Sequence, residues 1–136
     1  MTQINTDHFE KCIKTLETSL VFLEKAESDS IEYEMYRNSL VKGFELTLEQ
    51  GGKLLKKKMM PYFATKKQAD MLTFKDIFRH ANKHGLLTIE ETERWLNYRD
   101  NRNTIAHDYG EKFAEETIIL AKRLITDAKK IVEILQ

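Results

Sequence analysis

Apolar side chains recur at intervals of three and four residues along most of this chain, which is the spacing of one face of an α-helix. The segments that show this spacing are residues 7–26, 31–58, 74–84, 89–96 and 108–135. One proline and five glycines among 136 residues leave few turns for a sheet protein. The pattern therefore predicts an all-α fold, an antiparallel bundle of four main helices with one additional short helix at 74–84.

Helix starts are expected at four pairs of residues that have the spacing of a capping box. These pairs are Asp7 with Glu10, Thr73 with Asp76, Thr88 with Glu91, and Asp108 with Glu111. Pro61 ends the second helix, and residues 60–72 are expected to form a connection to the next helix. In the helix that begins at residue 89, the expected inward side chains are Ile89, Thr92, Trp95 and Leu96.

Three glycines interrupt the second helix, at Gly43, Gly51 and Gly52. Each costs a helix up to about 1 kcal/mol relative to alanine. Their presence indicates either a close approach of a neighbouring helix or a bend.

Composition is that of an ordinary globular protein, with 41% hydrophobic and 32% charged residues, and we expect a single domain over residues 1–136. The formal net charge is zero, so any RNA contact must come from a local patch. Cys12, the only cysteine, falls on the apolar face of the first helix, which favours a buried free thiol over a reactive one. We expect a cytoplasmic protein without membrane contact, because no signal peptide or long apolar run is present.

Polar chemistry is concentrated in residues 99–110. On a continuous helix Arg99, Asn103 and His107 share a face, whereas Arg102 and His107 are separated by about 140° around the axis. Arg102 and His107 converge only if the helix ends before His107, and the capping pair at Asp108 predicts that end. A guanidinium binds phosphate and an imidazole transfers protons near neutral pH, which suits phosphodiester chemistry. The alternative is that both side chains only complement the helix dipole and cap its carbonyl groups.

These residues resemble a known motif. Residues 102–109 fit the R-X4-H-X-Y form of the HEPN superfamily, with Asn103 directly after the arginine. The second helix resembles the HEPN branch of HepT-like toxins and nucleotidyltransferase substrate-binding proteins at Phe44, Glu45, Glu49 and Lys53. It departs from that branch at Gly52, where relatives often have tryptophan, so the packing there is expected to differ.

The resemblance implies a four-helix HEPN bundle that forms a homodimer and brings two motifs into one cleft. Members with an intact motif are metal-independent ribonucleases acting on tRNA or mRNA. Carried over, Arg102 would stabilise charge on the phosphorane, His107 would act as general acid or base, and Asn103 would orient the site. Glu45 would pair with Arg99 or Arg102.

The resemblance also implies a toxin-antitoxin system in which a minimal nucleotidyltransferase (MNT) partner AMPylates Tyr109 and silences the nuclease. A phosphate ester there would add negative charge and bulk where the RNA phosphate must bind. A tyrosine that only packs at a helix start is the alternative. Two other functions stay open: a non-catalytic substrate-binding subunit of a two-component nucleotidyltransferase, and a helical interaction module without chemistry.

Six lysines and no acidic residue lie between residues 53 and 67, together with Tyr62 and Phe63. Such a segment suits RNA backbone contact and base stacking, although a solvated helix end has the same composition. The lysines assigned to RNA are Lys56, Lys57, Lys58, Lys66 and Lys67. We expect no metal and no cofactor, because the one-turn spacing of His80 and His84 is weak evidence and no phosphate-binding loop is present.

Overall fold

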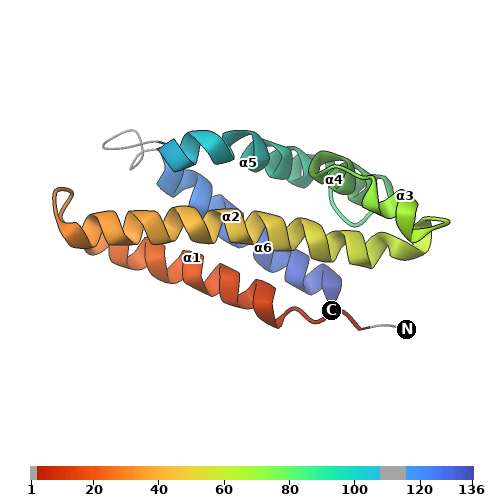
Figure 1. Ribbon diagram of the computed structural model, residues 1–136, viewed down its shortest axis with the longest axis horizontal. Helices are drawn as coiled ribbons and strands as arrows, with labels where there is room; N and C mark the ends of the chain where they lie inside the picture. Colours follow the sequence, from red (N-terminus) through yellow and green to blue (C-terminus); the bar gives the residue numbers. More distant parts are fainter. Residues whose placement is uncertain (1–2, 108–115) are drawn as a thin grey trace.

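Four long helices run alternately up and down the length of the molecule in the computed structural model (Figure 1), which describes residues 3–107 and 116–136, with 103–107 described by their backbone alone. These helices are α1 (Asp7–Lys25), α2 (Ile31–Met59), α5 (Ile89–His107) and α6 (Ile118–Leu135). The shorter α4 (Phe74–Lys83) packs against α2 and α5. The all-α bundle with an additional short helix is thus confirmed.

The connection between α2 and α4 contains two short helical elements. It contains a 3-10 turn, η1 (Met60–Tyr62), and the short helix α3 (Lys66–Asp70). Pro61 suits the first turn of a helix, because its missing N–H would have no partner there. Thr65 caps α3 by accepting a hydrogen bond from the backbone N–H of Gln68 at 3.2 Å. Residues 60–72 therefore connect the two helices as predicted, and they contain two short helical turns that the sequence pattern did not indicate.

Two of the expected capping boxes are confirmed. Thr73 and Asp76 exchange hydrogen bonds of 3.1 Å at the start of α4. Thr88 and Glu91 do the same at the start of α5, at 3.0 and 3.1 Å. Together these pairs satisfy N–H groups that have no partner inside the helix.

The first helix starts at Asp7 as predicted, but without the expected capping pair. Asp7 is its first helical residue rather than its cap, and Thr6 precedes it. The Thr6 hydroxyl donates to the Glu10 carboxylate at 3.0 Å, so Glu10 has a different partner from the expected one. The fourth pair, Asp108 with Glu111, lies outside the described residues.

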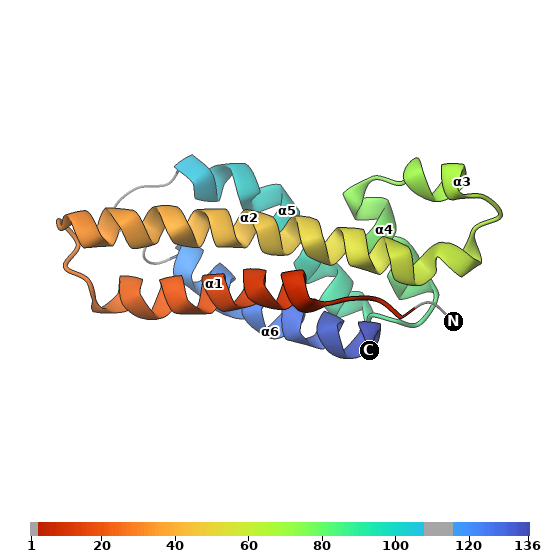
Figure 2. The same ribbon diagram turned by 60° about the horizontal axis from the view of Figure 1, so that its bottom comes forward.

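The core lies between α2 and the other helices, and Figure 2 shows α1 and α6 below α2 while α4 and α5 cross behind it. Close packing explains the glycines of α2. A Cβ atom at Gly43 would lie 3.3 Å from the backbone of Leu16, and one at Gly51 would lie 3.3 Å from Trp95. The glycines therefore let α1 and α5 approach α2 closely, as one of the two alternatives predicted.

The inward face of α5 differs in two positions from the prediction. Thr92 and Trp95 are buried as expected, but Ile89 is 53% exposed. Tyr98 is 1% exposed and was not expected in the core. Tyr98 lies three residues after Trp95, so the buried stripe of α5 runs farther toward residue 102 than the apolar pattern indicated.

Candidate functional site

Helix α5 carries the described part of the predicted motif, and aromatic side chains fix its rotation. Trp95 stacks on Phe78 of α4 with ring centroids 4.8 Å apart, and its edge meets Tyr98 at 5.7 Å. Tyr98 in turn meets Phe44 of α2 edge to face at 6.2 Å. Because these rings are buried, α5 cannot turn about its axis without opening the core.

The expected end of the helix before His107 is wrong, because α5 continues through His107. On this helix Arg102 and His107 lie about 140° apart around the axis, while Arg99, Asn103 and His107 follow one face. Arg102 is half-buried. The helix end that was expected to bring Arg102 and His107 of one chain together is therefore not present. Asp108 and Tyr109 lie outside the described residues.

Two contacts join the middle of α5 to the start of α4. The Arg99 guanidinium carbon lies 5.4 Å from the centre of the Phe74 ring, a cation–π geometry. Lys75 forms an ion pair of 2.6 Å with Asp100. These two contacts fix the rotation of α5 about its axis at a point one turn before Arg102.

Gly52 makes room for the aromatic ring beneath Arg99. A Cβ atom at this position would lie 3.1 and 3.2 Å from two carbons of Phe74. Gly52 therefore leaves the space that Phe74 fills, and Phe74 in turn lies under Arg99.

Glu45 does not have its expected partner within the described part of the chain. It is half-buried on α2, and no ion pair joins it to Arg99 or to Arg102. Arg99 instead lies over Phe74. The expected Glu45 contact is therefore not among the described interactions.

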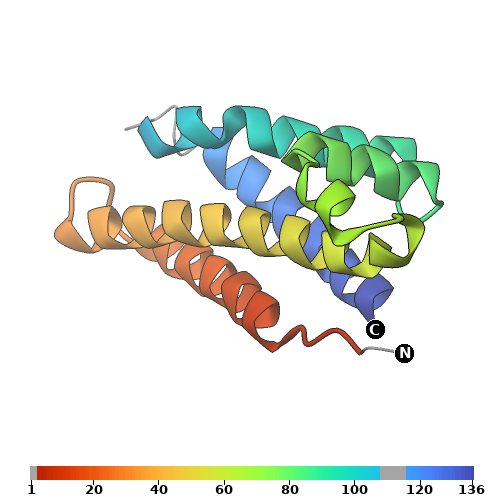
Figure 3. The same cartoon turned by 45° about the vertical axis from the view of Figure 1, so that its right-hand side comes forward.

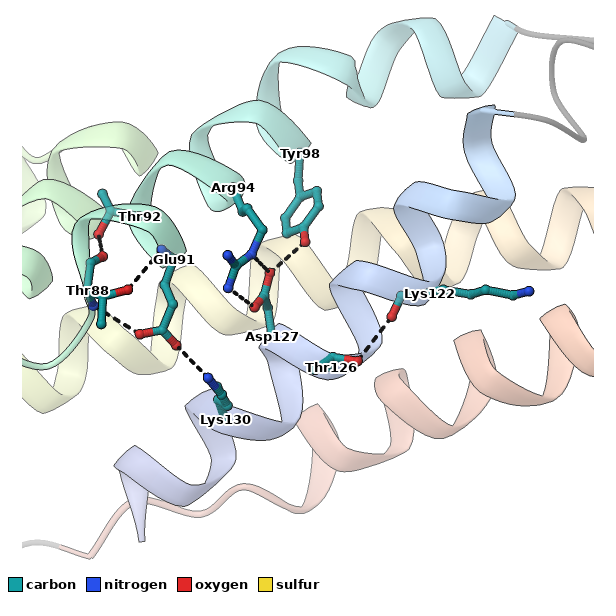
Figure 4. A network of polar contacts seen from close by, with 9 residues as sticks. All are labelled: Thr88, Glu91, Thr92, Arg94, Tyr98, Lys122, Thr126, Asp127 and Lys130. Carbon is teal, nitrogen blue, oxygen red and sulfur yellow. Dashed lines mark hydrogen bonds and ion pairs between the residues drawn. The ribbon is translucent and has the colours of Figure 1, made fainter.

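A buried polar network, absent from the sequence-based predictions, joins α5 to α6 (Figure 4). Asp127 of α6 accepts two hydrogen bonds from the Arg94 guanidinium, at 2.9 and 2.8 Å. It also accepts a bond of 2.6 Å from the Tyr98 hydroxyl. Asp127 is 3% exposed, so its charge is compensated by these donors rather than by water.

The network raises the pKa of two of its members, Tyr98 and Arg94. Burial and the hydrogen bond to Asp127 raise the pKa of Tyr98 well above its usual range. The same hydrogen-bonded carboxylate raises the pKa of Arg94. Tyr98 is therefore a permanent donor at neutral pH, and the arrangement is suited to holding α5 in register against α6 rather than to transferring protons.

A signal for this network was present in the sequence. Asp127 lies three residues after Leu124 and four before Ile131, on the apolar face of the last helix. A charged residue in that position requires a partner, because an unpaired buried charge is costly. Arg94 and Tyr98, one turn apart on α5, are suitable donors for it.

The predicted RNA-binding lysines lie at the end of the bundle that carries η1 and α3 (Figure 3). Lys57, Lys66 and Lys67 are exposed and Lys58 is half-buried. Lys56 forms an ion pair of 3.1 Å with Asp70, so part of its charge is neutralised. Helix α5 ends at the opposite end of the bundle (Figure 1), so the lysines and the motif are not brought together in one chain.

The cysteine and two of the histidines that were considered as reactive groups or metal ligands pack against other parts of the protein. Cys12 is 4% exposed, confirming a buried thiol, and burial raises its pKa, which lowers its reactivity. His80 and His84 lie against aromatic rings of Phe63 and Tyr62.

In the described ranges, no group of three or more His, Cys, Asp or Glu residues could hold a metal ion. None of the helices in the same ranges has the length and apolar character needed to cross a membrane.

Known proteins share this fold over nearly the whole chain. A substrate binding domain of a nucleotidyltransferase from Haemophilus influenzae superposes with a TM-score of 0.77 and 22% identity, covering 96% of this chain and 98% of that one. A protein from Thermus thermophilus superposes with a TM-score of 0.71 and 23% identity, covering 94% of this chain and 98% of that one.

Sequence comparison points the same way. The chain is 25% identical over 116 residues to a probable ribonuclease HepT of Haemophilus influenzae, covering 82% of this chain and 78% of the relative. Residues 5–136 match the family model described as nucleotidyltransferase substrate binding protein like. The chain therefore belongs to the nucleotidyltransferase substrate binding protein-like family.

Proposed function

We propose that this chain is the ribonuclease toxin of a HEPN/MNT toxin-antitoxin pair. The observation that carries the proposal is an Arg102 to His107 motif near the end of α5, within a domain that matches its family from residue 5 to residue 136. The similarity to a probable ribonuclease supports the same activity. The substrate is RNA, with tRNA or mRNA as the expected targets.

The proposed reaction needs no metal. A ribose 2′-oxygen forms a bond to the adjacent phosphorus, and the bond from phosphorus to the next 5′-oxygen breaks, which leaves a cyclic phosphate and a 5′-hydroxyl. The 2′-hydroxyl proton goes to a base, and the leaving 5′-oxygen takes a proton from an acid. His107 fills these roles, Arg102 neutralises the charge that develops on the phosphate, and Asn103 orients the groups.

The continuous helix supports a homodimer as the active form. One chain offers one histidine in this motif, whereas the reaction uses an acid and a base at the same time. A second copy supplies the second His107, and it can bring its Arg102 to a face of α5 that the first chain's Arg102 does not reach. The site is therefore incomplete without the partner.

Exposed apolar side chains support a contact surface at the same end of the bundle. They lie in the last two turns of α1, the first two turns of α2 and the start of α6, which gather where α5 ends (Figure 1). These side chains are Val21, Phe22, Ile31, Met35 and Ile119. A group of exposed apolar side chains of this kind is typical of a protein interface.

Silencing by the partner follows from the position of Tyr109 in the motif. AMPylation of its hydroxyl by an MNT-type nucleotidyltransferase would place a negatively charged group two residues from His107. Repulsion of the RNA phosphate and steric exclusion would both inhibit cleavage. The modified tyrosine would be detected by mass spectrometry after incubation with the partner and ATP, and Tyr109→Phe would remain unmodified and active.

The test of the nuclease uses purified chain, total RNA and EDTA. Wild type should cleave RNA with a metal-independent rate, and His107→Ala should lower the rate by about 100- to 10,000-fold, the usual contribution of a general acid or base. His8→Ala is the matched control, because His8 is an exposed histidine on α1 and should leave the rate unchanged. Equal rates for wild type and His107→Ala would refute the proposal.

The second candidate function is a non-catalytic subunit that presents a substrate to a nucleotidyltransferase. It is favoured by the description of the family and by the fold shared with a nucleotidyltransferase substrate binding domain. Co-purification with the nucleotidyltransferase fits both functions. Growth arrest on expression of wild type, relieved by His107→Ala, would select the toxin, and transfer activity that depends on this chain without any RNA cleavage would select the subunit.

A further inference from the structure

An aromatic stack stands at the end of the bundle away from the motif. The rings of Tyr62 in η1 and His84 after α4 are parallel, with centroids 3.9 Å apart and an interplanar angle of 4°. His80 continues the arrangement at 6.3 Å from His84, and the edge of Phe63 meets His80 at 5.3 Å. Because Phe63 also packs on the core, the stack has a fixed base.

The outer member of the stack is available to a ligand. Tyr62 is 54% exposed, although one face of its ring is covered by His84. More than half of this residue is therefore open to solvent while its ring is held against His84. A flat, rigid and half-exposed aromatic face is the feature on which proteins stack unpaired nucleic-acid bases.

The charge around the stack is strongly positive. Residues 53–85 carry nine lysines and arginines against two aspartates, a formal charge of +7 in a chain whose total is zero. The lysines that neighbour Tyr62 and His84 in sequence include the exposed Lys57, Lys66, Lys67 and Lys83. Such a local excess attracts the phosphates on either side of a stacked base.

We propose that Tyr62 and His84 form a stacking site for an unpaired RNA base, with the surrounding lysines binding the adjacent phosphates. The site rests on the proposed function for the identity of its ligand as RNA. His84 precedes α5, whose 19 residues span about 28 Å, and His107 lies at the far end of that helix. A substrate that occupies both places must extend over many nucleotides, which selects long or folded RNA over short oligonucleotides.

Binding is best measured in a His107→Ala background, where RNA is not consumed, by fluorescence anisotropy with labelled polyuridylate and with tRNA. Tyr62→Leu should weaken binding roughly 5- to 100-fold, the usual effect of losing one stacked base. Tyr62→Phe keeps the ring and should bind as the parent does. Tyr36→Leu is the matched control, because Tyr36 is stacked on Phe22, with ring centroids 5.2 Å apart, at the other end of the bundle.

The salt dependence separates stacking from charge. Tyr62→Leu should lower affinity without changing the slope of log Kd against log salt concentration, since it removes no phosphate contact. Lys57→Gln combined with Lys67→Gln should flatten that slope by about 0.7 for each lost contact. Unfolding temperatures of all variants, followed by circular dichroism, check that folding is intact.

Three results would overturn the stacking site: equal RNA affinity of Tyr62→Leu and its parent, equal weakening by Tyr36→Leu, or a loss of affinity in Tyr62→Phe as large as in Tyr62→Leu. None of these results bears on cleavage, which is measured separately with His107 intact. RNA binding that depends on Tyr62 in a chain that does not cleave RNA would refute the nuclease and retain the stacking site.

Discussion

Removal of the Asp127 carboxylate should destabilise the bundle far more than removal of a surface carboxylate. Asp127→Ala leaves the Tyr98 hydroxyl without its 2.6 Å partner, and Tyr98 is 1% exposed. A stranded buried hydroxyl costs about 1–3 kcal/mol. The Arg94 side chain is 39% exposed and can turn to water, so the lost ion pair adds only about 1 kcal/mol.

The expected loss in the free energy of unfolding is therefore about 3 kcal/mol. Folded domains gain roughly 2.1 cal/mol/K of unfolding entropy per residue, so this loss corresponds to a fall of about 10 °C in Tm for a chain of this length. Urea denaturation and thermal unfolding, both followed by circular dichroism, measure the two quantities. Asp70→Ala is the matched control, because its ion pair with Lys56 is exposed, and it should cost less than about 1 kcal/mol.

A second substitution tests the cause rather than the size of the effect. Tyr98→Phe in the wild-type background removes a hydrogen bond and should cost about 1 kcal/mol. In the Asp127→Ala background the same change removes a stranded hydroxyl, so it should restore about 1–2 kcal/mol. The reasoning is refuted if Tyr98→Phe destabilises both backgrounds equally, or if Asp127→Ala costs no more than Asp70→Ala.

Three further predictions concern alkaline pH, packing and capping. The folded-state pKa of Tyr98 is raised above its ordinary value of 10.0, so its contribution to stability is complete below pH 10 and is lost as the pH rises above 10. Between about pH 9 and pH 11, the unfolding free energy of wild type, measured in urea, should fall by about 1 kcal/mol more than that of Tyr98→Phe. Parallel losses in the two proteins would contradict this. Gly52→Ala brings a Cβ to 3.1 Å from Phe74 and should lower the unfolding free energy by about 1 kcal/mol, since overpacking outweighs the gain in helix propensity. A variant that is more stable than wild type in urea denaturation would mean that Phe74 shifts freely. Thr88→Ala removes the hydroxyl that accepts from the Glu91 N–H and should lower the unfolding free energy by about 1 kcal/mol, with an unchanged value arguing against the capping box.

The predicted helix starts succeeded where the chemistry is local. The capping boxes at Thr73 and Thr88 each lie within four consecutive residues, so the side chain and the N–H group that it satisfies are neighbours in sequence. The predicted start of α1 at Asp7 is also confirmed, but the expected pairing of Asp7 with Glu10 is not, because Glu10 accepts a hydrogen bond from the Thr6 hydroxyl.

The end of α5 could not be predicted by the same means. No glycine or proline lies between Arg102 and His107, so a cap at Asp108 was the only signal for an end before His107. The helix continues through His107, so Arg102 and His107 are separated by about 140° around its axis, and the single-chain pair expected from the sequence loses the helix end on which it depended.

The sequence by itself determined the helical class and the approximate helix boundaries, because periodicity and capping act over a few residues. Only the tertiary structure decided that Asp127 lies between Arg94 and Tyr98, since these residues are about 30 positions apart and meet through the packing of α5 on α6. The same holds for the stack of Tyr62 on His84. Contacts between distant segments depend on the relative rotation of whole helices, which side-chain packing across the core sets and no local pattern encodes.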